Sequence, residues 1–254
     1  MTQLTHSMNC MANPSDAAGI RSNMKPIAKW GASGLWNAFA SNTPGKIIKY
    51  SVLICPRPGR RSCVWKPAEN DRRWDLNDGA GLSQSANIRL ATIDDAQEIA
   101  KIHVATWRDA YKELLPIEYL ANLDENARAE KWRKALLAGA PCVLVAVMNG
   151  MVAGWVAFGP SRDEDLESRC AEIEAIYVAS EFWSRGIGTA LIHAACERLH
   201  AKGYGTVALW VLKNNAAACS FYSRRGFEPD GSAKVVEIGG ALLTEVRVTR
   251  EIAT

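Results

Sequence analysis

Two carboxylates in a short apolar segment are the residues of this chain best suited to acid–base chemistry. Glu172 and Glu174 lie in the sequence E-I-E-A-I-Y-V, whose β-branched and aromatic residues predict a strand over 171–178. Alternate residues of a strand face the same way, so both side chains are expected on one side of the sheet. A carboxylate with a raised pKa can accept a proton from a reacting group, directly or through water. Two solvated carboxylates on an exposed strand face are the alternative.

A glycine-containing loop follows this strand and leads into a helix. The sequence R-G-I-G-T at 185–189 comes directly before a run of apolar residues at helical spacing over 190–199. Glycines let backbone N–H groups approach a phosphate, and the helix dipole adds partial positive charge at that point. The order strand, loop, helix therefore predicts an anion site, although glycine also serves purely steric needs in such turns.

A second block begins about thirty residues downstream of the first. A predicted strand over 206–212 ends before Asn214 and Asn215, which are suited to cap a short helix, and a Gly-Phe pair closes that helix. Tyr222 lies about two turns into the helix. A tyrosine with an ordinary pKa of ~10 is protonated at neutral pH and can donate its proton to a leaving group. An aromatic side chain packed in the core is the alternative.

Together the two blocks resemble the GNAT superfamily of acyl-CoA-dependent N-acetyltransferases. The family pattern Q/R-x-x-G-x-G/A falls on 183–188, with Trp183 in place of the leading Gln or Arg. The pattern N-x-x-A-x-x-F-Y-x-x-x-G-F is matched without a departure over 215–227. The resemblance extends over roughly 87–251. It implies an α/β fold with a central mixed, largely antiparallel sheet and helices on both faces.

The resemblance also assigns roles to individual residues. The backbone of 185–189 would hold the pyrophosphate of acetyl-CoA, and the pantetheine arm would lie along 176–178, where this strand and 206–212 splay apart. Tyr222 would protonate the thiolate, and Glu172 is ranked ahead of Glu174 as the base, with water as a third option. The expected cofactor-binding residues are Ile176, Tyr177, Val178, Arg185, Gly186, Ile187, Gly188, Thr189 and Asn215.

The activity implied is transfer of an acetyl group from acetyl-CoA to a primary amine, by direct attack in a ternary complex. The family shapes its acceptor site from the first helices and the terminal hairpin, which here means Trp107, Arg108, Tyr111 and the turn at 239–243. These residue types suit a small-molecule amine and a peptide N-terminus alike. A non-catalytic acyl-CoA sensor is the alternative, and the presence of Tyr222 and Glu172 argues against it. Assembly into a homodimer is left open.

The elements that must position these residues can be placed along 87–254, the expected acetyltransferase domain. Apolar spacing, caps and the Asn149-Gly150 turn predict the order β-α-α-α-β-β-β-α-β-α-β-β. His103 falls among apolar helix positions and is expected to be a satisfied core residue. The loop over 159–169 contains four acidic residues, which are either simply solvated or form a rim that attracts a cationic amine.

The first 86 residues differ in character from the rest. They carry a net charge of +6, whereas the remainder carries −3. Pro, Gly, Ser and Asn are frequent, and only 46–55 has a strand-like pattern. We therefore expect a poorly ordered basic extension or the product of an over-long reading frame, with an accessory arm as the alternative. Binding of nucleic acid is disfavoured.

Composition excludes several other classes of protein. No run of about 18 apolar residues predicts a membrane span, and no basic-then-apolar N-terminus predicts secretion, so a cytoplasmic protein is expected. The seven cysteines are scattered without a C-x-x-C pair, and the four histidines show no ligand spacing. This pattern favours reduced thiols over a disulfide framework and predicts no metal site.

Overall fold

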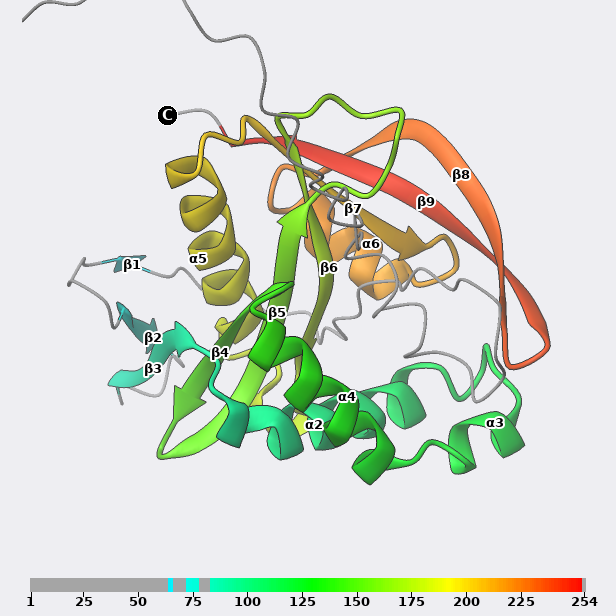
Figure 1. Cartoon of the computed structure of the whole chain (residues 1–254), viewed down its shortest axis with the longest axis horizontal. Coiled ribbons are helices and arrows are strands. Elements are labelled where there is room, and N and C mark those ends of the chain that lie inside the picture. Colours follow the sequence, from blue (N-terminus) through cyan, green and yellow to red (C-terminus); the bar gives the residue numbers. More distant parts are fainter. Residues whose placement is uncertain (1–63, 66–71, 78–82, 253–254) are drawn as a thin grey trace, which may run out of the picture. The chain divides into compact units, whose positions relative to one another are not determined.

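The computed structural model describes residues 64–65, 72–77 and 83–252, in which nine strands form one mixed sheet (Figure 1). The strands follow the spatial order β1-β2-β3-β4-β5-β6-β7-β9-β8, and all neighbours are antiparallel except β6 and β7. The strands are β1 (Val64–Trp65), β2 (Arg72–Asn77), β3 (Ser83–Leu90), β4 (Cys142–Met148), β5 (Met151–Pro160), β6 (Cys170–Val178), β7 (Thr206–Leu212), β8 (Glu228–Ile238) and β9 (Ala241–Glu251). The helices are α2 (Ala96–Ala110), α3 (Ile117–Ala121), α4 (Glu125–Ala138), α5 (Ile187–Ala201) and α6 (Ala216–Ser223), with single 3-10 turns η1 (Ile93–Asp95) and η2 (Ser180–Phe182).

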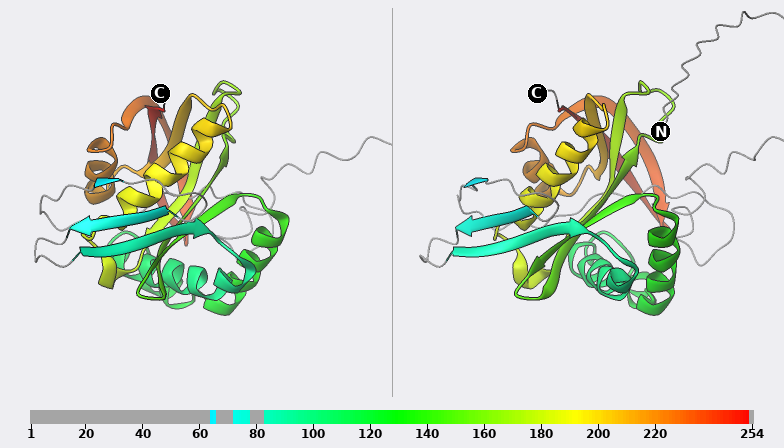
Figure 2. Two further views of the ribbon diagram at one scale, coloured as in Figure 1. Left: turned by 90° about the vertical axis from the view of Figure 1, so that its left-hand side faces the viewer. Right: turned by 60° about the vertical axis from the view of Figure 1, so that its left-hand side comes forward.

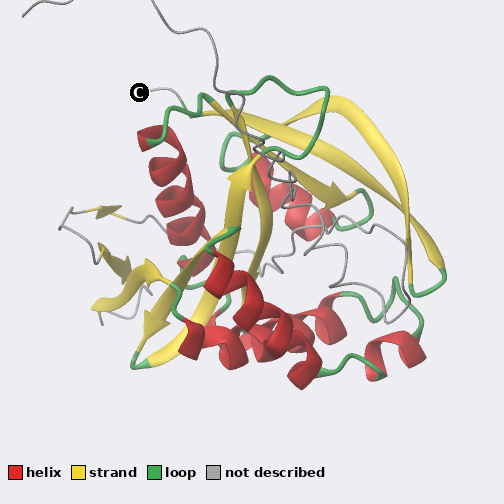
Figure 3. Ribbon diagram, viewed as in Figure 1, coloured by secondary structure: helices red, strands yellow, loops and turns green. Residues whose placement is uncertain are grey.

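The predicted α/β fold is confirmed. From β3 to β9, strands and α-helices follow the predicted order. Figure 3 shows the strands running between the helical segments of the two faces. In the described ranges, no helix combines the length and the apolar character that crossing a membrane requires.

The sheet extends upstream of the expected domain start. β3 begins at Ser83, so residue 87 falls inside this strand, and the whole of β2 pairs with it. The edge of β3 that faces away from β4 offers unpaired backbone groups, and β2 satisfies them in an antiparallel ladder. The division of the chain at residue 86 stays a prediction, and the strand predicted over 46–55 lies outside the described residues.

The two faces of the sheet carry separate cores (Figure 2). On one face α5 and α6 pack against the sheet, and on the other α2, α3 and α4 do so. His103 of α2 is fully buried in the second core, which confirms its predicted core position. Its ring stacks on that of Tyr177, with ring centroids 4.7 Å apart. This stacking joins the helical layer to the strand that carries the candidate site.

Local chemistry explains where several elements begin and end. The Asp124 carboxylate accepts hydrogen bonds from the first amide groups of α4, and Gly139 ends this helix in the left-handed conformation (φ +65°). Asn149 and Gly150, both with positive φ, make the turn between β4 and β5. These caps and turns fix the lengths of the elements that surround the site.

Candidate active site

The site is built around the divergence of β6 and β7. These parallel strands pair only at three positions, the last of which joins Glu172 to Ala208. Beyond it, β6 stays paired with β5 up to Val178, while β7 stays paired with β9 up to Leu212. The two inner edges therefore separate, and their backbone groups are available to an extended ligand, as in strand addition. The splay implied by the family resemblance is present (Figure 1).

A β-bulge in β6 places Glu174 at the divergence. Ala157 of β5 pairs with Ala175 and Phe158 pairs with Ile173, so Glu174 is the extra residue. The bulge reverses the alternation of side chains along the strand. Ile173 faces the core beneath α5, and so does Ile176, three residues later. Strict alternation, on which the expected directions of Glu172 and Glu174 rested, does not hold here.

Arg162 nevertheless contacts both carboxylates. Its Nε donates to Oε2 of Glu172 over 2.8 Å, its Nη2 donates to Oε1, and its own amide donates to the same carboxylate. The remaining nitrogen, Nη1, lies 3.2 Å from Oε2 of Glu174. Both carboxylates are buried, at 2% and 6% exposed, so they are not the solvated pair considered as an alternative.

The two carboxylates differ in how well they are satisfied. Glu172 receives the hydrogen bonds of Arg162, whereas Oε2 of Glu174 has no hydrogen-bond partner among the residues that the structure describes. Burial raises the pKa of Glu174 to about 7; the charge of Arg162 opposes this rise and that of Glu172 adds to it. A group with this pKa can take up or release a proton near neutral pH. Arg162 could not be found from sequence patterns, because only the fold brings its loop back to β6.

Tyr222 presents an unsatisfied hydroxyl inside the protein. Its side chain is fully buried, and its ring packs edge-on against Phe221 and Phe227, with centroids 5.2 and 5.7 Å away. Within the described part of the chain, its Oη has no hydrogen-bond partner. Burial raises the pKa of Tyr222 well above its ordinary value, so the phenol keeps its proton. A buried hydroxyl without a partner is costly and fits a ligand atom that arrives beside it.

The start of α5 has the form of an anion cradle. Gly186 is the N-cap in the left-handed conformation (φ +81°), and no side chain caps the first amide groups. The first N–H groups of a helix have no partner within it, so these can bind a phosphate. Thr189, in the first turn, accepts hydrogen bonds from Arg225, whose guanidinium lies 3.4 Å above the ring of Phe221. Arg225 brings positive charge to the cradle, and the sequence motifs did not indicate this residue.

Trp183 and Asn215 each make a defined hydrogen bond beyond the ends of β6 and β7. Nε1 of Trp183 donates to the carbonyl of Val178 over 2.7 Å, which ties the loop to the end of β6 and occupies that oxygen. Ile176 and Tyr177, also expected to contact the cofactor, are buried in the same strand. Oδ1 of Asn215 caps α6 by accepting from the amide of Ala218, which leaves the side-chain NH₂ to donate to a ligand.

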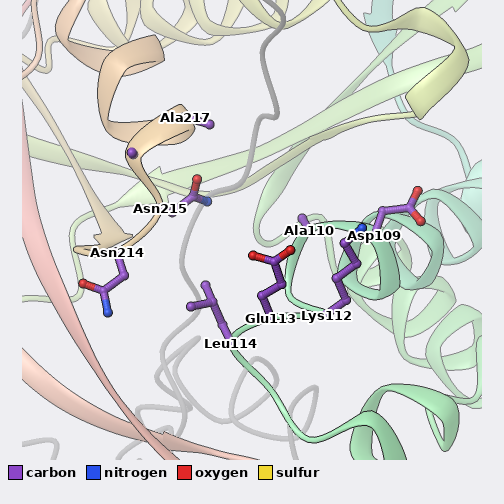
Figure 4. Close-up of a pocket in the computed structure, with 9 residues that line it drawn as sticks. Asp109, Ala110, Lys112, Glu113, Leu114, Asn214, Asn215 and Ala217 are labelled. Atoms are coloured by element: carbon purple, nitrogen blue, oxygen red, sulfur yellow. The ribbon is translucent and has the colours of Figure 1, made fainter.

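Asn215 also lines a pocket of about 300 Å³ between the end of α2 and the start of α6 (Figure 4). In Figure 4 the side chains of Asn215 and Glu113 reach toward the space between the two helices. The other lining residues are Asp109, Ala110, Lys112, Leu114, Asn214, Ala216 and Ala217. No group of three or more His, Cys, Asp or Glu side chains in the described ranges is arranged to hold a metal ion.

The residues expected to line the acceptor site have other contacts. Trp107 and Tyr111 are each only 1% exposed, and Nε1 of Trp107 donates to Oη of Tyr177 over 2.9 Å. Arg108 is exposed and donates to the backbone carbonyls of Leu120 and Leu123, which fastens α2 to the α3 segment. The family resemblance suggested these residues for the acceptor site, but it carried no information on how deeply each side chain is buried.

The turn of the terminal hairpin does approach the first helices. Gly239 (φ +57°) lies against Tyr119 of α3, and a β-carbon at residue 239 would collide with the tyrosine ring. Glycine is therefore required at this position for two reasons, its conformation and the close approach. The contact joins the β8–β9 hairpin to α3 on the side of the sheet that faces α2.

Comparisons with known proteins agree with this geometry. A family model described as the acetyltransferase (GNAT) family matches residues 99–227. The chain belongs to this family. It is similar to the uncharacterised N-acetyltransferase YuaI of Bacillus subtilis, with 36% identity over 161 residues, covering 63% of this chain and 89% of the relative. The GNAT chain is thus an acyl-CoA-dependent N-acetyltransferase.

Two further proteins are similar to this chain, one in sequence and one in structure. An L-methionine sulfoximine/L-methionine sulfone acetyltransferase of Pseudomonas paraeruginosa is 28% identical, covering 58% of this chain and 83% of the relative. The solved structure of YncA from Salmonella typhimurium, with its cofactor acetyl-CoA, has 21% identity and a TM-score of 0.52, covering 66% of this chain and 95% of that one. At 21% identity, the similarity to YncA shows the fold alone.

Proposed function

We propose that this protein transfers an acetyl group from acetyl-CoA to a primary amine by direct attack in a ternary complex, with Glu174 as the base and Tyr222 as the acid. The observation that carries the proposal is the buried Tyr222 hydroxyl, which has no hydrogen-bond partner among the described residues and interacts with Tyr177 of the diverging strand β6. A proton donor that is already desolvated suits a thiolate leaving group, whose charge develops only during the reaction.

The chain's own residues would hold the donor at two places. The first amide groups of α5, with Arg225 beside them, suit the pyrophosphate, and the inner edge of β6 suits the extended pantetheine arm. The NH₂ group of Asn215 would add a hydrogen bond between these two places. Bound acetyl-CoA supplies the activated thioester.

Each proton then has a defined destination. Glu174 accepts one proton from the ammonium, and the neutral nitrogen attacks the thioester carbon. The C–N bond forms, the C–S bond breaks, and its electron pair goes to sulfur, which takes the proton of Tyr222. A second proton leaves the nitrogen and restores the phenol through water. The products are an N-acetyl amide, CoA as its free thiol, and one proton released to solvent.

The choice of Glu174 reverses the ranking that the sequence suggests. Glu172 accepts three hydrogen bonds from Arg162, which occupy both of its oxygens and leave it poorly placed to accept a proton. Glu174 has an oxygen without a hydrogen bond and a pKa raised to about 7. These two properties support Glu174 as the base.

A non-catalytic acyl-CoA sensor would need the cradle but neither proton-transfer group. The test is a panel of primary amines incubated with acetyl-CoA while the free thiol is measured. We expect thiol release that depends on the amine and an acetylated product of matching mass. Tight binding of acetyl-CoA with no product from any amine would favour the sensor. Ping-pong kinetics would contradict the ternary complex.

The acceptor is a small-molecule amine or a peptide N-terminus under this proposal. One relative is named for acetylating L-methionine sulfoximine, which favours a small-molecule amine. The net negative charge of the domain beyond residue 86 also favours a cationic amine over an anionic one as the attacking end of the acceptor.

A further inference from the structure

Arg128 of α4 is a buried cation that contacts the imidazole of His103 and the ring of Trp107. The residue is only 6% exposed. Its Nη1 lies 3.1 Å from Nε2 of His103 and 3.5 Å from Nδ1. Its guanidinium carbon lies 5.6 Å from the centroid of the Trp107 ring. Both neighbours belong to α2, so the guanidinium is directed from α4 toward the layer between the helices and the sheet.

No carboxylate pairs with Arg128 in the ranges that the structure describes. Two other arginines are paired with carboxylates: the half-buried Arg162 contacts two glutamates, and the buried Arg247 contacts Asp163, Asp165 and Asp230. His103 does not supply a counter-charge. Its full burial, with the charge of Arg128 added, keeps the pKa of His103 well below its ordinary value, so the imidazole is neutral. A buried charge without an opposite charge destabilises a fold by several kcal/mol.

This cation lies next to the strand of the reaction centre. The ring of His103, which contacts Arg128, is stacked on that of Tyr177, three residues after Glu174 in β6. The positive charge of Arg128 is close enough to Tyr119 to oppose the rise in the pKa of that phenol. Tyr119 in turn contacts Gly239 of the terminal hairpin. Arg128 is thus placed among the elements that enclose the side of β6 facing α2.

We propose that Arg128 binds an anionic group of the acceptor, so that the substrates are amines that also carry a carboxylate or a comparable acid. The guanidinium offers five donors in a planar fork that matches a carboxylate, and within the described residues only Nη1 contacts an acceptor, the imidazole of His103. The acceptor's amine would face Glu174 and its acid would face Arg128. This assignment rests on the proposed function.

If Arg128 had a purely structural role, its removal would affect stability and acceptor preference differently. If Arg128 serves packing alone, its removal should lower stability and affect all acceptors equally. If it serves a ligand, its uncompensated charge is a cost in the free protein, so an apolar residue of similar size should leave stability unchanged or raise it. Stability and acceptor preference therefore have to be measured together.

The experiment uses the full chain, acetyl-CoA and pairs of amines that differ only by a carboxylate, namely L-leucine with 3-methylbutylamine and L-phenylalanine with 2-phenylethylamine. Wild-type protein should prefer the acid-bearing member of a pair. Arg128→Met should raise KM for that member about 10- to 100-fold and leave KM for its partner unchanged, as expected for losing charge-assisted hydrogen bonds. Arg128→Lys should restore part of the preference. Arg133→Met, on the same helix at a more exposed arginine paired with Glu130, is the matched control and should change neither.

Thermal unfolding of the same variants completes the test. Arg128→Met should melt at or above the wild-type temperature. A melting temperature several degrees lower, with equal loss of activity toward both members of each pair, would make Arg128 a structural residue and overturn the assignment. Equal use of both members by wild-type and variant would overturn it too, while leaving the acetyltransferase function intact. Absence of thiol release with every amine would contradict the proposed function, and this assignment with it.

Discussion

Arg162 Nη1 and Glu174 Oε2 lie 3.2 Å apart, close enough for charge attraction, yet Oε2 receives no hydrogen bond. The Arg162 guanidinium donates its hydrogen bonds to Glu172 instead. For Glu174, burial raises the pKa by more than the charge of Arg162 lowers it, and the pKa rises to about 7. This unequal sharing of one arginine gives two neighbouring carboxylates different chemical properties.

Replacing Glu174 by glutamine should slow the reaction strongly. Loss of the base should lower kcat about 10²- to 10⁴-fold, with little change in acetyl-CoA affinity. The acidic limb of the pH–rate profile, expected near pH 7 from the pKa of Glu174, should flatten. Initial rates of thiol release between pH 5 and 9 measure both effects.

Glu172→Gln is the matched control for that variant. It removes a buried partner of Arg162, so we expect a loss of about 1–3 kcal/mol in the free energy of unfolding. Turnover at a temperature where the variant is folded should fall less than about tenfold. If instead Glu172→Gln flattened the acidic limb and Glu174→Gln did not, the roles would be reversed.

Glu174 should also make stability depend on pH in an unusual direction. Its pKa is raised from 4.5 in the unfolded chain to about 7 in the folded protein, so the folded state binds more protons between these values. The resulting stabilisation is complete below about 4.5 and is lost as the pH rises through about 7; its upper limit is about 3 kcal/mol.

Urea unfolding of wild type and Glu174→Gln at pH 5 and pH 8 isolates this contribution. The free energy of unfolding of wild type, relative to that of the variant, should be lower at pH 8 than at pH 5. The comparison cancels carboxylates with the opposite trend, such as Asp95, whose hydrogen bonds to Arg89 and Thr92 outweigh its burial and lower its pKa. An equal difference at both pH values would mean that the pKa of Glu174 is ordinary.

Tyr222→Phe separates an acid from a core aromatic residue. Removing the hydroxyl should lower kcat by about one to three orders of magnitude, because the thiolate loses its proton donor. The melting temperature should stay the same or rise, since the hydroxyl makes no hydrogen bond within the described structure. Acetyl-CoA affinity, measured by calorimetry, should change little. Retained turnover would assign protonation of the thiolate to water.

Gly188→Trp tests the cradle at the start of α5. Gly188 is buried in the first turn, and an indole there should fill the space in front of the amide groups and abolish acetyl-CoA binding. Calorimetry measures the binding, and circular dichroism checks the fold. Leu137→Trp, at an exposed position of α4, is the control and should bind normally. Unchanged binding by Gly188→Trp would place the pyrophosphate elsewhere.

Features that depend on neighbouring residues could be predicted from the sequence. The strand–loop–helix unit around 185–189, the Asn149-Gly150 turn and the short helix α6 with Gly226 after its end follow from local turn chemistry and periodicity, and the structure contains all three. The order of elements from β3 to β9 follows from the same signals. Together with the spacing of the two motifs, this was enough to indicate the family.

Features that depend on register and burial were decided by the tertiary structure. The bulge at Glu174 breaks the alternation assumed for β6, because the pairing with β5 sets the register of the whole strand. Trp107 is buried and donates a hydrogen bond to Tyr177. Its burial depends on which face of α2 the sheet covers, and the helix sequence alone does not determine that.

The chemistry of the charged groups was decided at the same level. Arg162 is ten residues from Glu172 in sequence, Arg225 is thirty-six from Thr189, and Arg128 is twenty-five from His103. Sequence patterns carry no information on such pairs, because each distance depends on how loops and helices pack. The pKa of a carboxylate depends on the water removed around it and on the charges left nearby. The sequence therefore determined which residues were present for catalysis, and the tertiary structure decided that Glu174 is the carboxylate with a pKa near neutrality.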